Sequence, residues 1–156
     1  MADLVGAAKT AIAQASRWTE YGDCCLMPFY WKDDVPPSRG SPTPQDTIFE
    51  DMDGCDWYLA IIGGTLGSPT GQTTQGEFLS GVRAEFIYAH DRREHFTILM
   101  VYFLSDRARG IDPDELRRIE EFRRELRDKN VLYKELDTAK DFPSVLRDDL
   151  LRAFLK

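Results

Sequence analysis

Cysteine and long apolar runs are scarce in this sequence. There are three cysteines in 156 residues, two of them adjacent at Cys24 and Cys25. This is neither a disulfide framework nor a CxxC metal pair, and with only two histidines we expect no bound metal. The apolar run over residues 96–104 is far shorter than a membrane span, and no signal-peptide pattern is present. We therefore expect a cytoplasmic chain that does not associate with membranes.

Basic residues are also in the minority. Lysine and arginine total 20 against 27 aspartates and glutamates, so the formal net charge is −7. A chain that wraps nucleic acid needs a basic surface to displace counterions, so we expect no nucleic-acid partner. A length of 156 residues with 42% hydrophobic content is enough for one well-buried core. The sequence thus predicts a single domain over residues 1–156.

Two nearly continuous apolar runs indicate the class of fold. Residues 56–62 (DWYLAII) and 96–104 (FTILMVYFL) are typical of parallel strands that helices cover on both faces. Helical spacing or capping patterns predict helices over residues 3–18, 45–52 and 78–91, after Asp112, and from Pro143. Shorter strands are expected over 25–31, at a sheet edge because Pro28 lacks a donor, and over 131–133. This alternation predicts an α/β fold with a parallel sheet.

The helix after Asp112 has the best local start signal. Asp112 is an expected N-cap, Pro113 suits the first turn, and Glu115 is placed to complete a capping box. The buried face of this helix is expected to hold Leu116, Ile119, Phe122 and Leu126.

Candidate site residues fall where parallel strands end, because ligands of open parallel sheets bind beyond the carboxyl ends of the strands. They are Trp31, Asp33, Asp34, Gly63, Gly64, Thr65, Ser80 and Glu85. The glycines could admit a phosphate or ribose, but the turn is neither a P-loop nor a dinucleotide fingerprint, and such glycines are often only conformational. For Trp31 we favour packing at a strand end over stacking on a base, and for the two aspartates solvated loop positions.

Glu85 is the most interesting acid of this set. It lies beside the apolar stripe of its helix, so partial burial would shape its acid-base behaviour. From its own surroundings in the sequence, a surface salt bridge is the preferred interpretation over catalysis.

Four segments together resemble a known family. YWKDDVPP, DGCDWYLAIIGGTLGSPTG, SGVRAEFIYA and FTILMVYF are similar, in order and spacing, to TIR-like domains of unknown function at the N-termini of bacterial STAND-type signalling and defence proteins. That group is related to TIR and nucleoside deoxyribosyltransferase domains. The resemblance implies a flavodoxin-like sheet of five strands ordered 2-1-3-4-5.

The resemblance also implies a hydrolase activity and a site. Related domains cleave an N-glycosidic bond with a helix glutamate, and Glu85 occupies that position. NAD or another small nucleotide or nucleoside would be the substrate, with no cofactor required, and self-association through TIR-like surfaces is expected. Trp31, Asp33, Asp34, Gly63, Gly64, Thr65 and Ser80 would bind the nucleotide.

Two features depart from the family pattern. The family opens with a strand that has no counterpart in the given sequence, so either the strand at Asp56 pairs directly with the one at Cys25 or the chain is an N-terminally shortened form; QTTQGEFL is an apparent insertion before Ser80. Two functions therefore stay open: an NAD nucleosidase with Glu85 as its essential carboxylate, or a non-catalytic interaction module of a signalling assembly. A nucleotide-sensing domain is a distant third.

Overall fold

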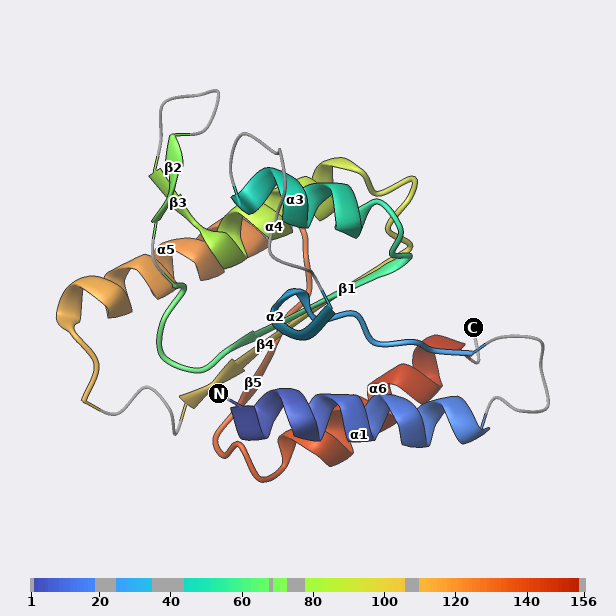
Figure 1. Cartoon of the computed structure of the whole chain (residues 1–156). Coiled ribbons are helices and arrows are strands. Elements are labelled where there is room, and N and C mark those ends of the chain that lie inside the picture. The colour runs from blue at the N-terminus through green and yellow to red at the C-terminus, as the bar shows by residue number, and fades with distance from the viewer. Residues whose placement is uncertain are drawn as a thin grey trace.

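The protein is described by a computed structural model that covers residues 2–18, 25–34, 44–67, 69–72, 78–105 and 110–154. Helices and strands alternate along much of the chain (Figure 1). The helices are α1 (Ala2–Trp18), α2 (Trp31–Asp34), α3 (Pro44–Met52), α4 (Gly81–Asp91), α5 (Pro113–Asp128) and α6 (Phe142–Phe154). The strands are β1 (Trp57–Ile62), β2 (Pro69–Gln72), β3 (Phe78–Ser80), β4 (Ile98–Leu104) and β5 (Lys134–Leu136).

The central sheet is parallel and has three strands in the order β1-β4-β5. The register between β1 and β4 runs from Trp57 opposite Ile98 to Ile62 opposite Phe103. The two apolar runs are therefore adjacent and parallel, as predicted. The α/β class is confirmed, with a sheet of three parallel strands flanked by helices, consistent with a flavodoxin-like sandwich.

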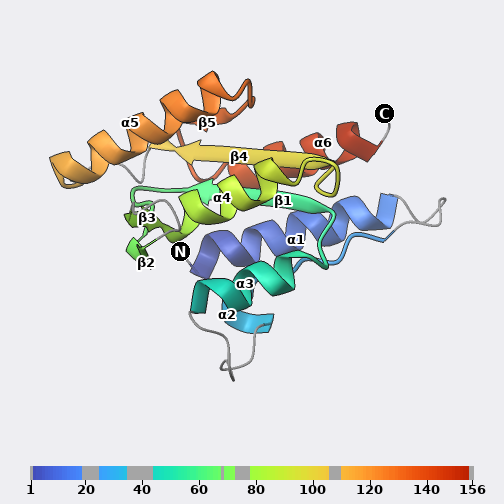
Figure 2. The same ribbon diagram turned by 90° about the horizontal axis from the view of Figure 1, so that it is seen from above.

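Helices cover both faces of this sheet (Figure 1, Figure 2). One face packs against α3, α4 and α5, and the other against α1 and α6. Because side chains alternate along a strand, Tyr58, Ala60 and Ile62 of β1 enter the first cluster and its remaining side chains face the second. None of the described helices has both the length and the apolar character needed to cross a bilayer.

The strand expected over residues 25–31 is not formed. Residues 25–30 have no regular secondary structure, and Trp31 begins α2. Two of their backbone donors bind side chains: Leu26 N donates to Ser16 Oγ (3.1 Å) and Tyr30 N to Asp34 Oδ2 (2.6 Å). Pro28 has no donor, so three of the six positions have no backbone donor free for a ladder.

The start of the helix expected over residues 78–91 is also different. Phe78–Ser80 forms β3, which pairs antiparallel with β2, and α4 begins only at Gly81. The apparent insertion before Ser80 thus belongs in part to a β-hairpin. Because Phe78 also fits the helical spacing of the apolar residues after it, the sequence pattern does not reveal this strand.

The last strand begins three residues later than expected, at Lys134 instead of Val131. The reason is the end of α5, where Asn130 adopts a left-handed φ of 55°. Asn130 N donates to Arg127 O and Val131 N to Leu126 O (2.8 Å), which is a Schellman motif. Val131 therefore closes the helix instead of opening a ladder.

The apolar stripe of α5 is buried in three of its four expected positions. Ile119, Phe122 and Leu126 are buried, whereas Leu116 is 39% exposed. Leu116 is the fourth residue of α5 and lies in its first turn.

Candidate functional site

Helix α4 holds Glu85 at the border between core and solvent. Ser80 is the N-cap of this helix, and its Oγ accepts a hydrogen bond from Arg83 N (3.3 Å). Its neighbours Ala84 and Phe86 are buried, the latter completely. Glu85 is consequently half-buried, as its position beside the apolar stripe predicts.

The surroundings of Glu85 make its carboxyl group a weaker acid than a glutamate in water. Burial raises its pKa from 4.5 to about 7, because desolvation disfavours the charged form. The amide of Gln45, near the start of α3, acts in the opposite direction through a hydrogen bond. Gln45 is buried and its Nε2 makes no hydrogen bond of good geometry with any described residue, so this contact is weak.

Tyr58 of β1 forms the third part of this cluster. Its hydroxyl donates to the carbonyl of Val82 in the first turn of α4 (3.2 Å). Burial raises the pKa of Tyr58 well above its ordinary value of 10, and the charge of Glu85 raises it further. Tyr58 is therefore a neutral phenol over the physiological range.

A carboxyl group with a pKa near 7 is chemically versatile. Both of its protonation states are populated at neutral pH, so it can take or give a proton, and its ionised form can stabilise a positive charge. Within the described part of the chain, no group of three or more His, Cys, Asp and Glu side chains is placed to hold a metal ion. The chemistry supported by this cluster is that of a single carboxyl.

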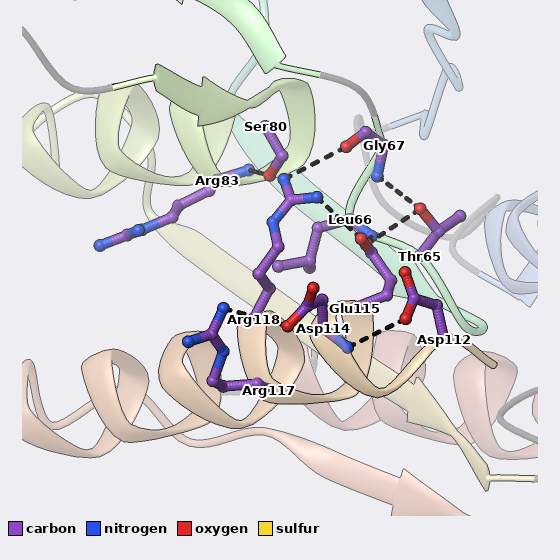
Figure 3. A network of polar contacts seen from close by, with 10 residues as sticks. All are labelled: Thr65, Leu66, Gly67, Ser80, Arg83, Asp112, Asp114, Glu115, Arg117 and Arg118. Carbon is purple, nitrogen blue, oxygen red and sulfur yellow. Dashed lines mark hydrogen bonds and ion pairs between the residues drawn. The ribbon is translucent and has the colours of Figure 1, made fainter.

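The loop that follows β1 is held by Glu115 of α5 (Figure 3). Glu115 Oε1 accepts hydrogen bonds from Thr65 Oγ1 (3.0 Å) and Leu66 N (2.7 Å), and its Oε2 pairs with Arg118 Nη1 (2.7 Å). The expected capping box is therefore wrong: Asp112 is the N-cap, accepting from the N–H of residue 114, but Glu115 binds a distant loop instead. Gly67 has a φ of 84°, a conformation that favours glycine, so this turn needs it.

The predicted site residues fall into separate places. Gly63 is buried, Gly64 is half-buried, and exposed Thr65 faces α5. Ser80 and the loop residue Leu66 line one cavity. Glu85 instead belongs with Gln45 and Tyr58.

The predicted site residues Trp31, Asp33 and Asp34 belong to α2, which lies beyond the edge of β1 that faces away from β4 (Figure 2). Asp34 is exposed and its carboxylate accepts the hydrogen bond from Tyr30 N. The side chains of Trp31 and Asp33 lie outside the described part. No contact among the described side chains joins Asp34 or Thr65 to Glu85, so a shared binding site for these segments stays a prediction.

Sequence reasoning missed the residues that surround Glu85 and the loop. The sequence pattern places Gln45 only at a helix start and Tyr58 only in an apolar run. Arg118 follows Glu115 by three residues, which is the spacing of a helical ion pair, so its pairing could have been found. The sequence pattern does not show that Glu115 of this pair also accepts a hydrogen bond from a loop about fifty positions earlier in the chain.

Comparison with protein families gives one match. A family model for a domain of unknown function, DUF4062, matches residues 23–151. No significant match is found among curated proteins or among solved structures.

Proposed function

We propose a function from the site of this chain, which belongs to the DUF4062 family of domains of unknown function. The proposed reaction is hydrolysis of the N-glycosidic bond of NAD or a related nucleotide or nucleoside. The proposal is supported by Glu85, a half-buried carboxyl whose pKa is raised to about 7. The motif resemblance to TIR-like domains, which places this residue at the position of a helix glutamate, supports it independently.

The chemistry follows from where charge develops. When the bond between ribose C1′ and the base nitrogen breaks, both electrons leave with the base and the ribose becomes oxocarbenium-like. An ionised carboxylate close to C1′ stabilises that charge, and more strongly in a partly desolvated site than in water. Water then supplies the oxygen of the new C1′–O bond and loses a proton.

The neighbours of Glu85 fit this role. Gln45 lies beside the carboxylate and favours its ionised form through a weak hydrogen bond. Tyr58 keeps its proton and fixes the first turn of α4 through Val82, so it brings no competing negative charge. We infer that Glu85 is the catalytic carboxylate and that the other two are positioning residues.

The test is release of nicotinamide from NAD by concentrated protein, followed by liquid chromatography. Glu85→Gln is nearly isosteric and should lower the rate by at least about 10²-fold. Glu94→Gln is the matched control. Glu94 is exposed and lies just after α4, and this substitution removes the same charge as Glu85→Gln. Equal losses in both variants, or no release of nicotinamide or of a base from nucleosides by wild type, would exclude the proposal.

A second candidate, a self-associating interaction module, is favoured by a different observation. Met27 (87% exposed) and Phe29 (39% exposed) are large hydrophobic side chains exposed two residues apart in the segment 25–30. Sedimentation velocity over a range of concentrations tests it. Association of wild type that Met27→Asp abolishes would support this function, and a monomer at all concentrations would contradict it.

A further inference from the structure

The loop that follows β1 carries two backbone donors without a partner. Residues 63–67 come directly after the carboxyl end of β1, and ligands of open parallel sheets bind beyond such strand ends. Gly63 is buried and Gly64 is half-buried, and neither N–H forms a hydrogen bond with any other residue in the described part of the chain. Because buried N–H groups are nearly always paired, these two can bind the oxygen atoms of a ligand.

The hydroxyl group of Thr65 is used to hold the loop itself. Its Oγ1 accepts a hydrogen bond from Gly67 N (3.0 Å) and donates its only hydrogen to Glu115 Oε1 (3.0 Å). The hydroxyl therefore has no hydrogen left to donate to a phosphate or a ribose. The backbone N–H groups of the two glycines remain as donors for a ligand.

The conformation of this loop is set from α5. Glu115 Oε1 also accepts a hydrogen bond from Leu66 N (2.7 Å), and Arg118 pairs with Glu115 Oε2 while its Nη2 reaches the carbonyl oxygen of Gly67 (3.4 Å). Figure 3 shows both side chains reaching from α5 to the loop. The side chain of Glu115 is only 16% exposed, so water competes little for these contacts. Removal of its carboxylate would release consecutive loop positions at once.

We propose that Glu115 is a positioning residue for nucleotide binding. It fixes the loop so that the N–H groups of Gly63 and Gly64 are held ready for the oxygen atoms of the nucleotide, and it does not touch the ligand itself. A loop that is fixed before binding loses little conformational entropy when the ligand arrives, so this contact raises affinity. The class of ligand rests on the proposed function, whereas the binding can be measured without turnover.

Isothermal titration calorimetry with NAD measures this binding, and initial rates of nicotinamide release give kcat and KM. Glu115→Ala should weaken NAD binding and raise KM by at least about tenfold with little change in kcat, because the loop loses its fixed conformation while the catalytic carboxyl is intact. Glu115→Gln keeps an acceptor oxygen for Thr65 and Leu66, so it should bind NAD as wild type does.

Glu120→Ala is the matched control. Glu120 also lies on α5 and pairs with an arginine three residues later, Arg123, but its side chain is 57% exposed and makes no contact with the loop. Its removal should leave NAD binding unchanged. If Glu115→Ala fails to fold, as seen by circular dichroism, Thr65→Val is the second variant: it keeps the contact of Glu115 with Leu66, loses the other two, and should also weaken NAD binding.

The outcomes separate this inference from the proposed reaction. Weakened binding in Glu115→Ala that Glu115→Gln restores would support it, even if wild type binds NAD without cleaving it, a result that would contradict only the N-glycosidase activity. Unchanged binding in folded Glu115→Ala, equal losses in Glu115→Gln or Glu120→Ala, or no heat from NAD with folded wild type would overturn it. A fall in kcat with KM unchanged would also overturn it, because the loop would then act on the chemical step instead of on binding.

Discussion

Replacing Glu85 by glutamine should change the pH dependence of stability. The pKa of Glu85 is raised from 4.5 to about 7 in the folded chain, mainly because its charged form is desolvated. Below pH 4.5 the carboxyl is protonated in both the folded and unfolded states, and its stabilising contribution is fully present. As pH rises toward and through 7, the unfolded state has already lost its proton and the folded state must ionise a half-buried group, so that contribution is lost.

The magnitude follows from the two pKa values. At roughly 1.4 kcal/mol per pH unit, ionisation of Glu85 in the folded state costs about 3 kcal/mol, an upper bound because water reaches part of the side chain. Glutamine cannot ionise, so Glu85→Gln should equal wild type in stability near pH 4.5 and exceed it by up to about 3 kcal/mol at pH 8.5. Urea unfolding followed by circular dichroism from pH 4 to 9 measures this difference.

Glu94→Gln is the control for this series, since the exposed side chain of Glu94 changes its environment little on folding. A Glu85→Gln effect that is the same at pH 4.5 and pH 8.5 would refute the reasoning, because it would show that the carboxyl ionises as easily in the fold as in water.

Other expected outcomes concern activity, the loop and the core. If ionised Glu85 is the catalytic form, kcat/KM for NAD should rise with pH through about 7 and level off above it, and a falling profile would assign the acid form instead. Glu115→Ala should destabilise the protein by about 2 kcal/mol and speed hydrogen exchange of the Leu66 amide, which loses its acceptor; Thr65→Val, which keeps that acceptor, should cost less. Phe122→Ala should cost about 3–5 kcal/mol because this ring is fully buried against Phe86 and Phe103, whereas Leu116→Ala should cost less, both measured by urea unfolding.

The parts of the fold that could be predicted are those in which local pattern and tertiary role agree. The runs that became β1 and β4 are apolar on both faces because helices cover both, so composition and environment indicate the same structure. Residues 25–30 have equally strand-like composition, yet Leu26 N and Tyr30 N donate to the side chains of Ser16 and Asp34 instead of to a strand. Strand composition indicates an extended chain, and whether a ladder forms depends on a neighbour that the local sequence does not specify.

The candidate site could be predicted in part, for a similar reason. The half-burial of Glu85 follows from its place next to Phe86, and helical spacing shows that directly. Its contact with Gln45 depends on how α3 packs against α4, and no spacing within either helix encodes this. The raised pKa is therefore a property of the assembled fold.

Glu115 shows why an acid in a helix start pattern is ambiguous. An aspartate N-cap followed three residues later by glutamate suits a capping box, since the glutamate can reach back to the cap. The same first-turn position also points the side chain past the end of the helix, toward whatever loop lies beside it. Here the loop after β1 offers Thr65 Oγ1 and the N–H of Leu66, a residue only 1% exposed whose donor needs a partner. The carboxylate gains more by satisfying that buried donor than by capping an end where water competes, so the tertiary contact replaces the local one.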